Sequence, residues 1–241
     1  MASDWIAIGR HGGSGVVAHA MRGASWLSSA QGSDETGALA ALGHGEARLV
    51  RIGDGAPEAV PAPVLPKSGG GCPALTQQTP ADVIGAWVRI WIAGFLASRE
   101  NWDGIICAQE GGISHWLHVS ADEVVSCQSF LTPRLNEALG AAAAPDEAAL
   151  ADSLSRPERL AAHLRAAEVA GNATALTGHL IGAELAAARP YWLGQQVAVI
   201  GDRLGYAGAL QAQGVPVDVV AAEDLEPLGL QALGTRLGLA G

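Results

Sequence analysis

Lysine is almost missing from this chain, because Lys67 is the only one and the other thirteen basic residues are arginines. Any lysine that clamps a phosphate group must therefore be Lys67 or be absent. Charge is also sparse: 16% of the residues are charged, and 24 acidic against 14 basic side chains give a formal net charge of -10. An acidic surface repels nucleic acid and anionic lipid. We therefore expect neither nucleic acid nor a membrane as the main partner.

Cysteines are few, and their spacing argues against the usual cysteine-based frameworks. The three of them, Cys72, Cys107 and Cys127, are an odd number at wide spacing, with no close Cys/His cluster. The sequence therefore predicts reduced, buried thiols rather than disulfides or a zinc site. His115 and His118 are three residues apart, so on a strand they point to opposite faces and cannot chelate one metal ion together. No metal site is predicted.

No apolar run is long enough to cross a membrane. The most apolar window, from Val83 to Ala97, is shorter than a membrane span and contains Arg89. The first ten residues, MASDWIAIGR, lack the basic segment and long apolar core of a secretion signal. With 241 residues, of which 49% are hydrophobic, the chain is expected to be a cytoplasmic globular protein with one large domain or two smaller ones.

Two segments share one pattern, in which an apolar strand leads through a glycine-rich turn into a second strand. They cover residues 5–21 and 102–120. Their turn residues are Gly12, Gly13 and Ser14 in the first segment and Gly111, Gly112 and Ser114 in the second. Such a turn can offer backbone N–H groups to a phosphate, whereas an ordinary hairpin needs glycine only for its turn. The repeat indicates two related halves, with a chance similarity as the alternative.

The other elements are expected from caps and apolar periodicity. Residues 28–75 are rich in glycine, proline and serine, which favours irregular structure or edge strands. Thr79 is expected to cap a buried helix that ends near Ser98, and Ser155 to begin another helix that ends near Gly171. A further helix then leads into a strand, a glycine loop, a helix and a strand that close the chain.

The last third of the chain contains a glycine loop and an isolated acidic residue. Gly201, Asp202 and Gly205 follow a strand and precede a helix, which suits a nucleotide at the carboxyl end of a strand. A crossover that needs glycine only for close packing is the alternative. Glu184 lies on an otherwise apolar helical face, so its carboxylate is either buried and functional or extended to the helix edge. His115 is a further candidate, because it follows the second glycine turn.

Together these segments resemble the 2-dehydro-3-deoxygalactonokinase family, sugar-acid kinases of the hexokinase–actin type. The runs LTGHLIGAELAAARPYW, VAVIGDRLGYAGALQAQGVPVDVV and LEPLGLQAL carry the resemblance, and the two glycine turns fall where the family has its phosphate hairpins. The resemblance implies a two-lobed α/β fold of the hexokinase/actin-like (ribonuclease H-like) class. We expect an N-terminal lobe over residues 1–98 and a C-terminal lobe over residues 99–241.

The resemblance also implies ATP and Mg²⁺ as cofactors and a sugar acid as substrate. Adenine and ribose are expected beside the loop from Gly201 to Gly205, with the phosphates toward the second glycine turn. The cofactor-binding residues are then Gly12, Gly13, Ser14, Gly111, Gly112, Ser114, Gly201, Asp202 and Gly205. His115 and Glu184 are the expected substrate-binding residues.

Several positions that carry the family's chemistry are replaced. Gly9 stands where the family has the aspartate of its first hairpin, and His115 stands where it has a lysine. Arg134 replaces an acidic residue. Phosphoryl transfer needs cations for the phosphates and usually a carboxylate to place the metal or accept the hydroxyl proton. No catalytic residue can therefore be assigned from the sequence.

Three functions stay open at this point. The family implies an ATP-dependent carbohydrate kinase that phosphorylates 2-dehydro-3-deoxy-D-galactonate. The replaced motifs favour a catalytically silent relative that binds a nucleotide, a sugar acid or a protein, and they predict absent or very weak turnover. A generic two-layer α/β binding domain is the third. Whether the protein is an enzyme, forms a homo-oligomer or has a protein partner is left open.

Overall fold

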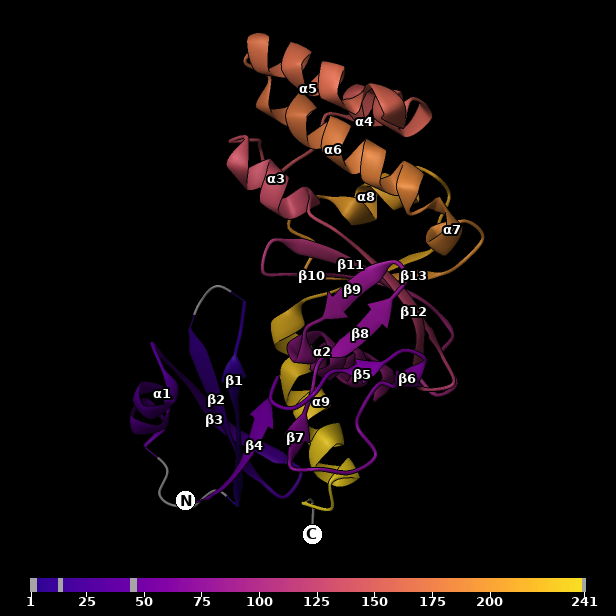
Figure 1. Ribbon diagram of the computed structural model, residues 1–241. Helices are drawn as coiled ribbons and strands as arrows, with labels where there is room; N and C mark the ends of the chain where they lie inside the picture. Colours follow the sequence, from indigo (N-terminus) through magenta and orange to yellow (C-terminus); the bar gives the residue numbers. More distant parts are fainter. Residues whose placement is uncertain (1–3, 13–14, 44–46, 240–241) are drawn as a thin grey trace. The chain divides into compact units, whose positions relative to one another are not determined.

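The structure is a computed structural model that describes residues 4–12, 15–43 and 47–239 (Figure 1). The chain forms two compact units, both of which contain strands and helices, so the predicted α/β class is confirmed. Unit 1 comprises Met1–Asp103, Val119–Ser126 and Ala222–Gly241, and unit 2 comprises Gly104–His118 and Cys127–Ala221. The expected division after residue 98 differs from these units, because it assigns residues 119–126 and 222–241 to the C-terminal lobe.

The main sheet of unit 1 has the strand order β3-β2-β1-β4-β7. Its strands are β1 (Trp5–Arg10), β2 (Val16–Arg22), β3 (Ser25–Gly32), β4 (Arg48–Ile52) and β7 (Gly71–Cys72). β1 pairs antiparallel with β2 and parallel with β4. The two strands predicted within residues 5–21 are therefore confirmed. Alternate side chains of β1 and β2 pack against helix α1 in one apolar cluster.

Helix α1 (Glu35–Leu42) lies in the segment for which composition predicts irregular structure, and that prediction is wrong there. The side chain of Asp34 caps the helix by accepting a hydrogen bond from the Gly37 N–H at 2.8 Å. Gly43 ends the helix in the left-handed conformation, with a φ of 69°. The run from Ala38 to Leu42 consists only of alanine and leucine, which favour helix, and Ala38 and Leu42 are buried. Composition averaged over residues 28–75 hides this short helical run.

The predicted helix start at Thr79 is also wrong. A small sheet stands there, made of β5 (Glu58–Ala59), β8 (Leu75–Gln78) and β9 (Ala81–Ile84). Thr79 and Pro80 form the turn between β8 and β9, which pair antiparallel. The ladder occupies the backbone groups that would otherwise enter a helix. Helix α2 (Ala86–Leu96) therefore begins only after β9, and it is buried over nearly its whole length, as predicted.

Helix α2 packs backbone to backbone against helix α9 (Ala222–Arg236) within unit 1. A Cβ at Gly94 would lie 2.2 Å from the Leu225 carbonyl oxygen, and a Cβ at Gly229 would lie 2.0 Å from the Ile90 carbonyl oxygen. Only glycine permits so close an approach. The approach brings the first turns of α9 beside the tryptophans of α2.

Arg89, the charged residue of the apolar window, is fully buried in α2. Its guanidinium donates hydrogen bonds of 2.7–3.0 Å to Glu58 Oε2 and to the carbonyl oxygens of Pro63, Val64 and Pro73. A buried charge is tolerated only when it is paired and hydrogen-bonded in this way. Arg89 therefore ties the irregular segment after β5 to the core of unit 1.

The sheet of unit 2 has the order β14-β13-β10-β11-β12. The first residues of β12 belong to unit 1, where they pair with the short β6 (Ala62–Pro63). The strands of the unit 2 sheet are β10 (Gly104–Glu110), β11 (Ile113–Ser120), β12 (Glu123–Phe130), β13 (Val197–Ile200) and β14 (Val217–Val220). β10, β13 and β14 run parallel. The second predicted strand pair, over residues 102–120, is thus confirmed, as is the closing strand, loop, helix and strand.

A helical layer completes unit 2 (Figure 1). It contains α3 (Thr132–Ala138), α4 (Glu147–Ser155), a 3-10 turn (Pro157–Arg159), α5 (Leu160–Val169), α6 (Ala173–Ala187), α7 (Arg189–Trp192) and α8 (Tyr206–Gln211). The predicted helix start at Ser155 is wrong, because Ser155 ends α4 and its hydroxyl donates to the Ala151 carbonyl at 3.0 Å. Glycines let α6 approach α4: a Cβ at Gly182 would lie 2.2 Å from the Leu150 carbonyl oxygen.

The cysteines are buried free thiols, as predicted. Burial raises the pKa of the Cys72 thiol to about 11, and it raises the pKa of Cys107 well above the ordinary value. The thiols are therefore unreactive core residues.

In the part of the chain that the structure describes, no helix is long and apolar enough to cross a bilayer.

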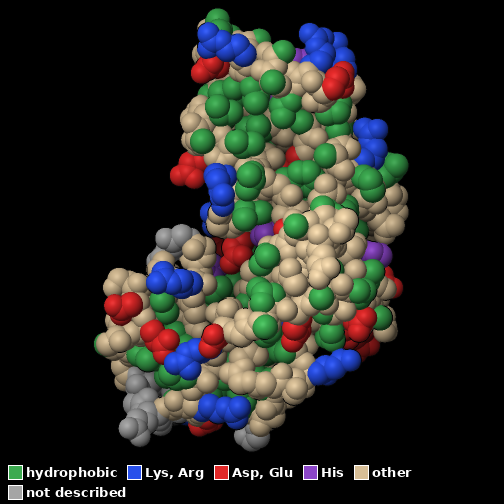
Figure 2. Space-filling model, in the orientation of Figure 1, with side chains coloured by type: hydrophobic (Ala, Val, Ile, Leu, Met, Phe, Trp, Pro, Cys, Tyr) green, Lys and Arg blue, Asp and Glu red, His purple; other side chains and the backbone are tan. Residues whose placement is uncertain are grey.

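Hydrophobic side chains gather over the helical layer of unit 2 on the face shown in Figure 2. Among the exposed apolar residues, Leu131, Leu135 and Leu139 follow one another at intervals of four along α3 and its two flanking residues. Residues four apart share one side of a helix. These three side chains form an exposed leucine stripe along one side of α3.

Candidate functional site

In unit 2, two glycine loops follow neighbouring parallel strands. β10 and β13 stay in register up to Ala108 opposite Ile200, so the next residues lie at one edge of the sheet. Gln109 connects the two loops: its Oε1 accepts a hydrogen bond from the Arg203 N–H at 3.3 Å, and its carbonyl oxygen lies 3.6 Å from the position of a Cβ at Gly201. Ligands of α/β proteins bind at such carboxyl ends of strands.

The hairpin turn after β10 combines glycine backbone with a cation. Gly111 and Gly112 have φ values of 54° and 82°, which glycine adopts at little cost. Arg134 covers this turn, because its N–H donates to the Gly112 carbonyl at 3.0 Å and its Nε lies 3.7 Å from the position of a Cβ at Gly112. Successive N–H groups in such turns can surround an anion, and arginine pairs well with phosphate oxygens. The turn therefore suits a phosphate group.

Asp202 holds the second glycine loop in place. Its Oδ1 accepts hydrogen bonds from the N–H groups of Gly205 and Tyr206 at 3.0 and 2.8 Å, and its Oδ2 accepts one from Ala207 at 3.1 Å. The carboxylate thus occupies the N-terminus of α8, where a phosphate would otherwise bind. A nucleotide in this loop would therefore have to use other groups for its phosphates. The cofactor-binding role of the loop stays a prediction.

Glu184 is the centre of a buried hydrogen-bond network. It accepts bonds of 2.8 Å from Ser114 Oγ, Trp116 Nε1 and the Tyr206 hydroxyl. Burial raises its pKa, and hydrogen bonds from Thr132 and from these three donors oppose the rise. The network ties α6 to β11 and to the start of α8, and so it supports both glycine loops. The cofactor contact expected for Ser114 and the substrate contact expected for Glu184 both stay predictions.

His115 points away from open solvent and is 2% exposed. Its Nδ1 lies 2.6 Å from Ser129 Oγ, whereas His118 on the same strand is half-buried. The hydrogen bond to β12 gives His115 a role within the sheet. The substrate contact expected for His115 stays a prediction.

The first glycine hairpin belongs to unit 1. Gly12 has a φ of 55°, and the N–H of His11 donates to the Gly15 carbonyl at 3.1 Å across the turn. Gly13 and Ser14, which are also predicted to bind the cofactor, lie outside the described residues. The predicted cofactor contact of Gly12 stays a prediction.

A cluster of histidine, tryptophan and glutamate stands beside this hairpin in unit 1. His11 Nε2 lies 2.9 Å from Glu226 Oε1, and His19 Nε2 lies 3.6 Å from Glu226 Oε2. Trp91 Nε1 donates to Glu226 Oε1 at 3.2 Å. The His11 ring also meets Trp87 and Trp91 edge-on, at centroid distances of 5.2 and 5.6 Å. No local pattern links α9 to the first hairpin, so Glu226 could not be recognised from the sequence.

The cluster keeps Glu226 ionised. Burial alone would raise its pKa, but hydrogen bonds from His11 and Trp91 and the charges on His11 and His19 lower it below the ordinary value. Burial lowers the pKa of His19, although Glu226 opposes this shift. The side chains of His11 and Glu226 are 24% and 15% exposed. The pair is therefore a charged, partly accessible group that can exchange a proton.

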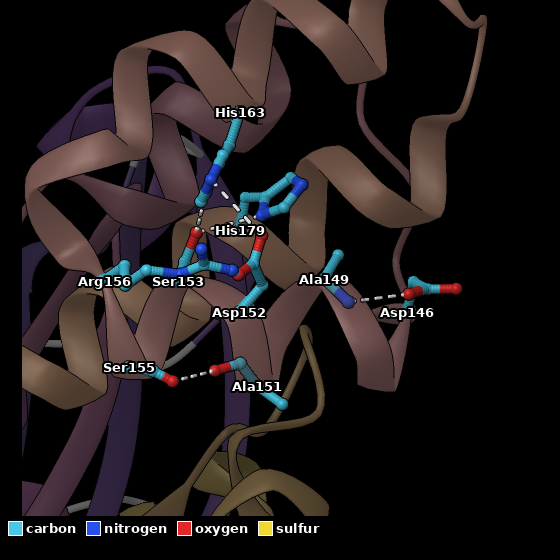
Figure 3. A network of polar contacts seen from close by, with 9 residues as sticks. All are labelled: Asp146, Ala149, Ala151, Asp152, Ser153, Ser155, Arg156, His163 and His179. Atoms are coloured by element: carbon cyan, nitrogen blue, oxygen red, sulfur yellow. Dashed lines mark hydrogen bonds and ion pairs between the residues drawn. The ribbon is translucent and has the colours of Figure 1, made fainter.

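A second polar cluster joins α4, α5 and α6 in unit 2 (Figure 3). Ser153 Oγ lies 3.0 Å from His163 Nδ1 and 2.9 Å from His179 Nδ1. His163 Nε2 lies 3.3 Å from Asp152 Oδ2, and Arg156 pairs with the same carboxylate. The residue types are those of a serine hydrolase triad, but Ser153 is 0% exposed. Its hydroxyl is also already bonded to both histidines, so this cluster supports the packing of the helices.

Acidification is expected to destabilise unit 2 through His179. Burial and the neighbouring His163 lower its pKa below 6.5 in the folded state. The unfolded chain therefore binds the proton first, and stability present at neutral pH is lost as the pH falls below about 6.5. A His179→Gln variant should lose less stability than the wild type between pH 7.5 and 5.5. Urea unfolding measures this, with His118→Gln as control; equal losses in all three proteins would contradict the expectation.

Comparison with known proteins identifies the family. The model of the 2-keto-3-deoxy-galactonokinase family matches residues 72–233, which is more than half of the chain. The crystal structure of a protein assigned as a 2-dehydro-3-deoxygalactonokinase, from Sinorhizobium meliloti, is similar with a TM-score of 0.77 and 19% identity. The match covers 95% of this chain and 97% of that chain. No curated protein matches the chain.

Two further solved structures share the fold. Component A of the (R)-2-hydroxyglutaryl-CoA dehydratase from Acidaminococcus fermentans has a TM-score of 0.51 and 10% identity, over 94% of this chain and 95% of that chain. The activator of the 2-hydroxyisocaproyl-CoA dehydratase from Clostridium difficile, with bound ADPNP, has a TM-score of 0.50 and 10% identity, over 96% and 93%. The predicted hexokinase/actin-like fold is thus confirmed. By its sequence match, the chain belongs to the 2-keto-3-deoxy-galactonokinase family.

Proposed function

We propose that this protein is a sugar-acid kinase that transfers a phosphoryl group from ATP to a hydroxyl of 2-dehydro-3-deoxy-D-galactonate. The observation that carries this function is that two glycine loops lie at one edge of the sheet in unit 2, with Arg134 over one of them. The chain that contains them is a member of this kinase family. Glycine N–H groups and a guanidinium are the partners that phosphates prefer. The reaction takes place in the cytoplasm, with small molecules as partners.

Magnesium fits this chain as an ion carried by the nucleotide. Among the described residues there is no group of three or more His, Cys, Asp or Glu side chains that could hold a metal ion. Mg²⁺ keeps several waters and usually binds phosphates together with one or two carboxylates, so it needs no protein cage. In unit 2, the Asp202 carboxylate is already occupied by the backbone N–H groups of Gly205, Tyr206 and Ala207. When bound, Mg-ATP supplies the phosphoryl group that is transferred.

The His11–Glu226 pair takes the proton-acceptor role. Gly9 replaces the aspartate of the family's first hairpin, but Glu226 brings a carboxylate to the same turn through His11. A base for a sugar hydroxyl must be ionised and at least partly accessible, and the pair has both properties. The hydroxyl proton passes to Glu226, either directly or through the His11 ring. This assignment removes the main reason for which the sequence alone favours a silent relative.

The test is an assay that couples ADP release to a colour change. We expect ADP release that requires the sugar acid, with 2-dehydro-3-deoxy-D-gluconate as the stereoisomer that tests substrate choice. Arg134→Gln should raise the KM for ATP by about tenfold, because a charge-assisted hydrogen bond is lost. Arg165→Gln, at an exposed position of α5, is the matched control. Nucleotide binding in calorimetry without any turnover would contradict the kinase and favour the silent binding relative.

A further inference from the structure

Gln109, at the end of β10, has a buried amide group with an unused donor. The residue is 5% exposed. Its Nε2 is buried and has no hydrogen-bond partner among the residues that the structure describes. Buried donors are nearly always paired, because an unpaired one forfeits its bonds to water without compensation. An unpaired donor at the carboxyl end of a strand therefore indicates a missing acceptor.

The orientation of this amide is determined by its other atom. Gln109 Oε1 accepts the hydrogen bond from Arg203 N–H at 3.3 Å. If the amide were flipped, its NH₂ group would face the Arg203 N–H. Two donors would then face each other, and the Arg203 N–H would lose its acceptor. Nε2 therefore points away from Arg203 N, and it meets no acceptor among the residues that the structure describes.

The surroundings of Gln109 favour an oxyanion as that ligand. The residue is two positions before the Gly111–Gly112 turn, and it contacts the Gly201–Gly205 loop directly. Arg134 contributes a cation at the turn, while the Asp202 carboxylate is neutralised in part by three backbone N–H groups. Phosphate oxygens only accept hydrogen bonds, which matches a group that can only donate.

We propose that Gln109 Nε2 donates a hydrogen bond to a phosphate oxygen of the bound nucleotide, and that Gln109 thereby couples the phosphates to the Gly201–Gly205 loop through Arg203 N. This rests on the proposed nucleotide binding by unit 2, and it adds a residue that no sequence motif marks. Binding of a nucleotide supplies the acceptor that the amide lacks. In return, the amide transmits the position of the phosphates to the loop expected to hold the ribose.

The glutamate variant isolates this donor. Gln109→Glu keeps an oxygen for Arg203 N–H and changes only the NH₂ group into a second acceptor. Calorimetry at pH 7.5 should show that the variant binds ADP about 10- to 100-fold more weakly, because a hydrogen bond to a charged oxygen is lost and a repulsion replaces it. Adenosine should bind both proteins equally. At lower pH, protonation of the introduced carboxylate restores a donor, so the difference in ADP affinity should shrink.

Two further variants separate the contributions. Gln109→Met has similar length and no charge, so a loss of at least about tenfold in ADP affinity there reflects the missing donor rather than repulsion. It also replaces the glutamate variant as the test if the latter does not fold. Gln213→Glu makes the same chemical change at an exposed position after α8 and should bind ADP like the wild type.

Each possible outcome of these measurements tests a different claim. Equal ADP affinity of the wild type and both Gln109 variants overturns the role of Gln109 and leaves the kinase intact. An equal loss for adenosine and ADP overturns the phosphate contact, because the amide then meets the nucleoside. A wild-type protein that binds no ADP removes the proposed function, and the role of Gln109 with it. Selective loss of ADP binding with unchanged thermal stability supports the proposal.

Discussion

Replacing Glu226 by glutamine is expected to lower kcat for sugar-acid phosphorylation by about 10²- to 10⁴-fold, which is the usual contribution of a positioned general base. The amide has nearly the shape of the carboxylate, so Trp91 Nε1 keeps an acceptor, but it cannot take up the hydroxyl proton. The KM values should change less, because Glu226 acts in proton transfer rather than in binding. Initial rates of ADP release at saturating ATP and sugar acid measure the effect.

The pH profile and a matched variant make this prediction specific. Because the pKa of Glu226 is lowered, wild-type kcat should persist to a lower pH than an ordinary glutamate would allow, and fall only below that pKa. Glu223→Gln makes the same change in the first turn of α9 and should keep the wild-type rate. If Glu226→Gln retains more than about a tenth of wild-type kcat, the base lies elsewhere.

Removing the carboxylate of Glu184 is expected to destabilise unit 2 by at least about 3 kcal/mol. Ser114, Trp116 and Tyr206 would each lose the acceptor of a buried hydrogen bond, and each unpaired donor costs about 1–3 kcal/mol. The cavity left by Glu184→Ala adds to the loss. Urea unfolding followed by tryptophan fluorescence measures the change, because Trp116 itself belongs to the network.

Two comparisons separate this network from general effects of charge removal. Glu184→Gln keeps the volume but presents an NH₂ group to one of the donors, so its stability should lie between those of the wild type and the alanine variant. Glu137→Ala removes a carboxylate at an exposed position of α3 and should cost little. An alanine variant at position 184 as stable as the one at 137 would show that the network contributes nothing to the fold.

Short-range pattern accounts for the parts of the fold that were predicted correctly. The two strand pairs around glycine turns follow from alternation of apolar residues, and α2 follows from its continuous apolar run. The candidate position of Glu184 on an apolar helical face follows in the same way from the spacing within α6, and Glu184 is buried there. In each case the residues that specify the element lie within it, so their effect does not depend on the rest of the chain.

The two helix starts that were predicted wrongly have a common cause. Thr79 and Ser155 have the side chains of helix caps, yet Thr79 stands in a strand turn and Ser155 ends a helix. Short polar side chains serve turns, starts and ends of helices equally well. Their actual use depends on neighbours such as the β8–β9 ladder, which a local pattern does not reveal.

The sequence by itself determined the family, the α/β class and the glycine turns, because these depend on residues that are close together in the chain. Only the tertiary structure brought Glu226 to His11 and Gln109 to Arg203. These contacts join distant segments, and they depend on the close approach of α2 to α9 at Gly94 and on the register of β10 with β13. Side chains acquire such partners only when backbone packing places them within hydrogen-bond distance, so no local pattern could indicate them.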